Sequence, residues 1–130
     1  MRQKTINCKL KEIGNTLLKK EYKDEWSEEN PTYGYCYIVS EMLYHYIYKN
    51  STPYYLKLNG VTHWFLKNEN KIIDLTGNQF NFEIDYSKAK KAAFFQGSFE
   101  TDRGKISKRG YNLAKRFGII DREGGKIITN

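Results

Sequence analysis

Three residues in the order Cys36, His63 and Asp74 carry the side chains needed for nucleophilic catalysis by a thiol. A cysteine nucleophile reacts as the thiolate, so it needs a neighbouring base, and that base needs a third group to hold its orientation. Histidine and aspartate can fill these two roles, and a helix N-terminus beside the cysteine favours the thiolate through its unpaired N–H groups. The order predicts a Cys-His-Asp triad, provided that the fold brings the three side chains together.

The cysteine is expected to open a helix that runs from Cys36 to about residue 49. At about 100° per residue, Val39, Leu43 and Ile47 fall on the same side of that helix as Cys36, which makes an apolar stripe. The segment 50–53 ends the helix with a proline. Upstream, residues 30–34 are typical either of a turn or of a helix N-cap followed by proline.

Three short runs after this helix are rich in β-branched and aromatic residues, which is typical of strands. They cover residues 54–58, 61–66 and 71–76, with turns at Asn59-Gly60 and at 67–70 between them. A loop of two or four residues at the second turn places Asp74 opposite Phe65, on the same sheet face as His63 and one diagonal step away. A three-residue loop without a bulge would turn Asp74 to the other face. Trp64 points away from His63 and is expected to pack in the core instead of touching substrate.

Four further elements complete the predicted fold. The expected elements are a short helix ending near Gly14, a short strand at 81–86, a helix from Ser87 to Phe95, and a helix from Ser107 to Phe117 capped by Ser107. In the last helix, Leu113 and Phe117 should face the core, while Lys108, Arg109, Lys115 and Arg116 should be largely exposed. Helices before and after a small antiparallel sheet predict a single α+β domain over residues 1–130.

Composition limits the classes of protein to which the chain can belong. It has 130 residues, a formal net charge of +7, 15% aromatic residues and two cysteines. The aromatic content excludes a disordered chain, and two cysteines are too few for a disulfide scaffold. No apolar stretch reaches the length of about 18 residues that a membrane span needs, and the first residues lack a secretory signal. We therefore expect a basic protein of the cytoplasm with reduced thiols and no membrane association.

Each candidate residue also has a plain structural interpretation. A cysteine on an apolar helix stripe is often a small core residue, a strand histidine is often structural, and Asp74 could simply begin a turn. His45 lies about 180° around the helix from Cys36 and is expected to be a surface or packing residue. Cys8 has no base assigned to it and is interpreted as structural. A zinc site formed by Cys8, Cys36 and His63 lacks a close-spaced ligand pair, so neither a metal nor another cofactor is predicted.

Several motifs together resemble the YunG-like family, whose pattern is a Pro-x-x-Gly-Gln-Cys segment, a strand histidine and Asp-Leu-Thr before Gln-Phe. The resemblance covers residues 26–117 and includes a Ser-Arg…Tyr-x-Leu ending. The matching residues are Trp26, Pro31, Gly34, Cys36, His63, Trp64, Asp74, Leu75, Thr76, Gln79, Phe80, Ser107, Arg109, Tyr111 and Leu113. Tyr35 stands here where the family commonly has glutamine. The order of Cys, His and Asp also resembles papain-like and transglutaminase-like cysteine enzymes, in which the cysteine opens a helix packed on a sheet.

The resemblance implies a role for each residue. Cys36 would be the nucleophile, His63 the general base and acid, and Asp74 its orienting partner. The Cys36 N–H and a side chain from Asn30 or Gln79 would hold the oxyanion, with Tyr35 at the adjoining position. The expected function is a thiol-dependent hydrolase or acyl transferase acting on an amide or other acyl group of a protein or small molecule.

Two other classes of function remain open from the sequence. The basic charge would suit a non-catalytic module that binds nucleic acid through its phosphates and bases. The small size and the richness in lysine, asparagine and tyrosine would suit a protein-interaction or inhibitor domain, such as a phage or mobile-element factor.

Overall fold

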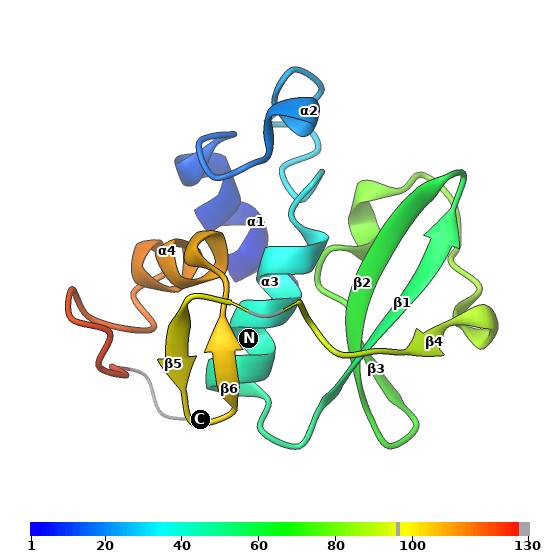
Figure 1. The fold of residues 1–130 in the computed structure, drawn as a ribbon. Coiled ribbons are helices and arrows are strands. Elements are labelled where there is room, and N and C mark those ends of the chain that lie inside the picture. The colour runs from blue at the N-terminus through cyan, green and yellow to red at the C-terminus, as the bar shows by residue number, and fades with distance from the viewer. Residues whose placement is uncertain (96, 128–130) are drawn as a thin grey trace.

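A central helix lies between an antiparallel sheet on one side and two further helices on the other (Figure 1). This computed structural model describes residues 1–95 and 97–127. The helices are α1 (Gln3–Ile13), α2 (Lys20–Lys23), α3 (Cys36–Met42) and α4 (Lys108–Arg116). The strands are β1 (Thr52–Leu58), β2 (Val61–Asn68), β3 (Lys71–Ile73), β4 (Lys90–Lys91), β5 (Phe99–Thr101) and β6 (Gly104–Ile106). The predicted single α+β domain with helices packed on an antiparallel sheet is confirmed.

The main sheet has four strands in the order β3-β2-β1-β4, and β5 and β6 form a separate hairpin. Between β2 and β3, Asn68 pairs with Lys71 and Leu66 pairs with Ile73. This is the register that a two-residue turn at Glu69 and Asn70 imposes, and Glu69 has the positive φ of 56° that such a turn requires. The predicted register is therefore confirmed, and Asp74 follows directly after β3.

The core fills the space between α1, α3 and α4 and extends to the sheet. The apolar stripe predicted for α3 is fully buried, and α1 contributes a second stripe before it ends at Gly14. Leu113 and Phe117 of the last helix are also buried, as predicted. The largest fully buried side chains are Tyr35, Phe65, Ile6, Leu10, Ile38, Met42, Leu43, Leu66, Ile106, Leu113, Ile119 and Ile120. Within the described ranges, no helix is long and apolar enough to cross a membrane.

Two predicted elements between the sheet and α4 are wrong. Residues 81–85 form bends and irregular chain instead of a strand, and the expected helix from Ser87 to Phe95 is a single 3-10 turn, Tyr86–Lys88, followed by β4. β4 pairs with Tyr54 and Tyr55 of β1, which would otherwise be an open sheet edge. Pairing across the sheet thus outweighs the local helical preference of this segment.

The helix that begins at Cys36 widens in its second half. Leu43–Ile47 form a π-helical turn, and the Tyr48 N–H donates to the Leu43 carbonyl at 2.7 Å. The Arg103 guanidinium donates to the carbonyls of Tyr44, Tyr48 and Ser51 at 3.0–3.1 Å, and its carbon lies 3.7 Å from the Tyr44 ring centre. One arginine from the β5–β6 turn therefore satisfies the carbonyls that the end of this helix leaves free.

The central helix is tied to α4 by a buried carboxylate. Glu41 is fully buried and accepts hydrogen bonds from the Ser107 N–H at 3.0 Å and the Ser107 hydroxyl at 2.5 Å. Ser107 is the N-cap predicted for α4, because its oxygen also accepts from the Gly110 N–H at 3.0 Å. Burial raises the pKa of Glu41, and the bonds from Ser107 oppose that shift.

Replacing Gly110 with alanine is expected to lower the free energy of unfolding by about 1–3 kcal/mol. A Cβ at this position would lie 2.7 Å from Glu41 Oε1 and 3.1 Å from Ile106 Cγ1, so the buried carboxylate must shift. This cost outweighs the gain of about 1 kcal/mol that alanine brings inside an exposed helix. Urea denaturation measures the difference, with Lys108→Ala in the same helix as the exposed control. Stability equal to or above wild type in Gly110→Ala would contradict the prediction.

Candidate active site

Cys36 is the first residue of α3 and follows a tight turn. Residues 30–34 form a turn and not an N-cap, which settles the two alternatives left by the sequence. Gly34 has a φ of +78°, and a Cβ there would lie 3.0 Å from Leu18 and 3.1 Å from Tyr22. Glycine is required because it is the residue that tolerates both the left-handed backbone and the close approach. The turn therefore directs the chain into the helix with Cys36 at its N-terminus.

Side chains of the same turn bind the loop that follows β3. Asn30 Nδ2 donates to the Gln79 carbonyl at 3.1 Å, and the Thr32 hydroxyl donates to Asn78 Oδ1 at 2.7 Å. Trp26 Nε1 donates to the Pro31 carbonyl at 2.9 Å and holds the turn from its other side. These bonds fix the position of Cys36 relative to the segment that contains Asp74.

His63 and Asp74 are in direct contact in the interior. His63 Nε2 lies 2.7 Å from Asp74 Oδ2, and the two side chains are 0% and 3% exposed. The Tyr86 hydroxyl donates to the same oxygen at 2.6 Å, and Thr76 donates to Oδ1 through its N–H at 3.3 Å and its hydroxyl at 3.4 Å. An ionised carboxylate only accepts hydrogen bonds, so Nε2 carries a proton and Asp74 fixes the orientation of the ring.

The other ring nitrogen of His63 is buried without a hydrogen-bond partner among the described residues. Burial by itself lowers the pKa of His63, but hydrogen bonding and charge from Asp74 and then from Cys36 raise it to about 9. Because Asp74 occupies Nε2, the nitrogen available to the Cys36 sulfur is Nδ1. Nδ1 makes no hydrogen bond among the described residues, and the Cys36 sulfur donates to the Thr62 carbonyl instead.

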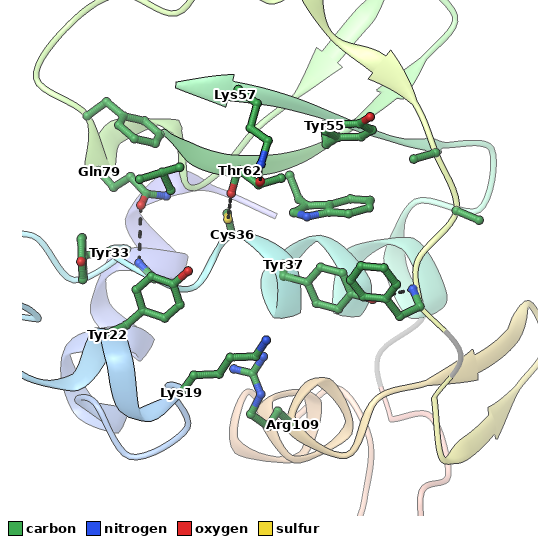
Figure 2. Close-up of a pocket in the computed structure, with 17 residues that line it drawn as sticks. Lys19, Tyr22, Tyr33, Cys36, Tyr37, Tyr55, Lys57, Thr62, Gln79 and Arg109 are labelled. Carbon is green, nitrogen blue, oxygen red and sulfur yellow. Dashed lines mark hydrogen bonds between the residues drawn. The ribbon is translucent and has the colours of Figure 1, made fainter. Parts of the chain in front are cut away.

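The Cys36 side chain is 8% exposed and lines a cavity of about 660 Å³ (Figure 2). Its thiol donates a long hydrogen bond of 3.7 Å to the Thr62 carbonyl on β2. The cavity wall also contains seven aromatic side chains and three cations, Lys19, Lys57 and Arg109. Cys36 is therefore part of the cavity wall, while His63 is fully buried and does not line the cavity.

The three predicted oxyanion residues lie in different places. Gln79 lines the cavity with Cys36, and its Nε2 donates to the Thr76 carbonyl at 3.0 Å. Asn30 is not part of the wall and instead holds the Gln79 backbone. The placement of Tyr35 as a substrate-binding residue is not supported, because its fully buried ring extends into the core and its hydroxyl donates to the Gly14 carbonyl at 2.5 Å. Aromatic size made the core the favourable environment for this side chain.

One expectation about the surface needs correction at this cavity, and one residue expected in the core also lines it. Trp64 is buried and packs against Tyr37 and Phe94, as predicted, and it also forms part of the cavity wall. Arg109 is only half exposed, donates to the Leu17 carbonyl at 3.2 Å and lines the same cavity.

Tyr86, which binds Asp74, has no motif or spacing in the sequence that marks it. Lys57 could have been inferred from strand alternation, since it shares a β1 face with Tyr55.

The remaining histidine and cysteine lie away from this cavity. His45 Nδ1 is 2.6 Å from the Thr101 hydroxyl, and burial with the Arg103 charge lowers the His45 pKa to about 4. It is a packing residue, one of the two alternatives expected. Cys8 is an exposed free thiol. In the part of the chain that the structure describes, no three His, Cys, Asp or Glu side chains form a group that could hold a metal ion.

Comparison of the chain with models of known protein families, with curated proteins and with solved structures finds no match. The resemblance to the YunG-like family therefore stays a prediction from the motifs, and the interpretation of the site depends on its geometry.

Proposed function

We propose that the protein is a thiol-dependent hydrolase or acyl transferase in which Cys36, His63 and Asp74 form the catalytic triad. The observation that carries the proposal is the state of the His63 ring. Asp74 holds Nε2 at 2.7 Å, Nδ1 is buried without a partner among the described residues, and Cys36 begins the helix that packs on β2, the strand of His63. In this proposal the free Nδ1 serves the Cys36 thiol, and a base held at one nitrogen and free at the other is what cysteine catalysis needs.

The protonation state of His63 supports the same proposal. With its pKa raised to about 9 against the cost of burial, His63 is a strong enough base to accept the thiol proton at neutral pH. A cation beside a thiol favours the thiolate, and the position of Cys36 at the start of a helix acts in the same direction. In this proposal the Cys36 thiol leaves the Thr62 carbonyl and passes its proton to His63 Nδ1, which forms the reactive thiolate-imidazolium pair.

In the first half of the reaction, the Cys36 thiolate attacks the acyl carbon of the substrate. The carbonyl oxygen becomes an oxyanion, which the Cys36 N–H and the Gln79 amide stabilise after the amide turns from the Thr76 carbonyl. His63 gives its Nδ1 proton to the departing amine or alcohol, the bond to that group breaks, and a thioester on Cys36 remains.

In the second half, neutral His63 accepts a proton from water or from an acceptor amine. The deprotonated acceptor attacks the thioester carbon, and the carbon–sulfur bond breaks. The products are a carboxylic acid after hydrolysis or a new amide after transfer, and the thiolate-imidazolium pair is restored.

The position of the site in the fold supports a papain-like arrangement. The cysteine begins a helix that packs on an antiparallel sheet, and the histidine and the aspartate come from β2 and from the end of β3. In this arrangement the nucleophile and the base come from different elements, and packing of α3 on β2 sets the distance between them.

The rate of Cys36 alkylation by iodoacetamide at pH 7 tests the proposal. We expect His63→Ala to slow alkylation by about tenfold or more, since the thiolate loses its cationic partner. Asp74→Asn should slow alkylation to a smaller extent. Because asparagine has nearly the same size as aspartate, this variant still tests the triad if His63→Ala does not fold. Mass spectrometry of the modified peptides gives the rates at Cys36 and at exposed Cys8 in one sample.

His45→Gln provides the matched control, because His45 is also buried but lies away from the cavity. Its Cys36 alkylation rate should equal that of wild type. If Cys36 reacts no faster than Cys8 and is insensitive to His63, the triad is wrong. A binding module that works without Cys36 would then replace the enzyme, and steeply salt-dependent binding of nucleic acid would identify it.

A further inference from the structure

We infer that the cavity beside Cys36 selects an anionic acyl substrate with an aromatic or aliphatic body. This inference rests on the proposed function, because it assigns the substrate class of the same site. The residues that carry it are those of the cavity wall other than the three triad residues.

The charged side chains on the wall are all cationic. Lys19, Lys57 and Arg109 line the cavity, and the described wall residues include no carboxylate. None of the three cations forms an ion pair with another described residue. Glu25 is held outside the wall by the Tyr33 hydroxyl at 2.8 Å and does not line the cavity. A negative group on the substrate would therefore supply the charge that this wall lacks.

The cations come from separate parts of the chain and line the same cavity as Cys36. Lys57 on β1 donates to the Thr62 hydroxyl at 2.6 Å, and the Thr62 carbonyl accepts from Cys36. Arg109 on α4 and Lys19 before α2 lie on the opposite side, with Cys36 between them and Lys57 (Figure 2). Arg109 uses one nitrogen for the Leu17 carbonyl, which leaves further N–H groups to bind a carboxylate or phosphate.

The rest of the wall is mainly aromatic. Tyr37 packs edge-on against Trp64, with ring centres 5.1 Å apart, and stacks on Phe95 at 5.6 Å. Phe80 lines the cavity and packs edge-on against His63 at 5.1 Å. A volume of about 660 Å³ is in the range of pockets that enclose a small organic ligand. Aromatic walls bind an apolar body, and their low polarity strengthens its attraction to the cations.

The ratio of alkylation rates with iodoacetate and iodoacetamide tests the inference. The two reagents deliver the same small group, but one is an anion and the other is neutral. We expect the iodoacetate-to-iodoacetamide ratio to be several-fold higher at Cys36 than at Cys8. Cys8 is a strict reference because two cations, Lys9 and Lys11, follow it in the sequence. Each of Lys57→Gln and Arg109→Gln should lower the Cys36 ratio by about threefold, because each removes one positive charge from the cavity wall. Lys108→Gln in the same helix removes an exposed charge outside the wall and should leave the ratio unchanged.

A binding measurement separates failure of the inference from failure of the catalytic proposal. In Cys36→Ala, N-acetylphenylalanine should quench tryptophan fluorescence at a several-fold lower concentration than its neutral amide, and Arg109→Gln should remove the difference. If alkylation of Cys36 depends on His63 but neither the ratio nor the binding favours the anion, the substrate class is wrong and the triad stands. If alkylation does not depend on His63, the proposed function fails and the inferred substrate class fails with it.

Discussion

Cys36→Ala is expected to lower the rate of acyl transfer by about a thousandfold or more, because the covalent intermediate can no longer form. Activated esters with an anionic acyl group, such as p-nitrophenyl succinate, provide the assay. Release of p-nitrophenol gives the rate, and the mass of the intact protein shows one acyl group on wild type and none on the variant. Because Cys36 is small and its one hydrogen bond is long, the free energy of unfolding should change by about 1 kcal/mol or less.

The comparison variants separate the roles in the triad. Asp74→Asn should reduce the rate by less than Cys36→Ala, since it disturbs the orientation of His63 but leaves the nucleophile in place. Cys8→Ala removes the exposed thiol and should retain full activity and full acylation. If acylation persists in Cys36→Ala but disappears in Cys8→Ala, Cys8 is the reacting thiol and the proposal is wrong.

The stability of the protein should fall as the pH rises from about 6.5 to about 9. Despite the opposing effect of burial, Asp74 and Cys36 raise the pKa of His63 from 6.5 to about 9 in the folded state. In this range the folded protein binds more protons than the unfolded chain, so unfolding becomes easier as the pH increases. The stabilisation is fully present below pH 6.5 and is lost as the pH rises through about 9. The free energy of unfolding changes by up to about 3 kcal/mol in total. Urea denaturation at a series of pH values measures it.

Asp74→Asn is the control for this pH dependence. The amide has no charge, so it removes a principal cause of the raised pKa and leaves burial to lower it. The fall in stability above pH 6.5 should therefore disappear in the variant. His45 does not contribute to the pH dependence in this range. Its pKa is lowered to about 4 in the folded state, so its effect on the free energy of unfolding changes only below pH 6.5. A flat profile in wild type, or the same fall in Asp74→Asn, would contradict the assignment.

The sequence by itself determined the parts of the site that depend on local spacing. A two-residue turn at Glu69 and Asn70 sets the register of β2 and β3, and this register places His63 and Asp74 on one face of the sheet. Helical periodicity places Cys36 on the buried stripe at the start of its helix, and the Ser107 cap marks the start of α4. These features follow from the sequence because their energies depend on neighbours within a few residues.

Only the tertiary structure decided what surrounds those three side chains. Tyr86 reaches Asp74 from a segment whose predicted strand and helix do not form; Tyr86 begins a 3-10 turn, and Lys90 and Lys91 after it pair with β1. Arg109 and Lys57 meet at one cavity although they lie on different elements, and Trp64 serves the wall as well as the packing. Such contacts join residues far apart in the chain and depend on how α3, α4 and the sheet pack together. Periodicity assigns a side chain to a face, but packing decides whether that face meets the core or a cavity.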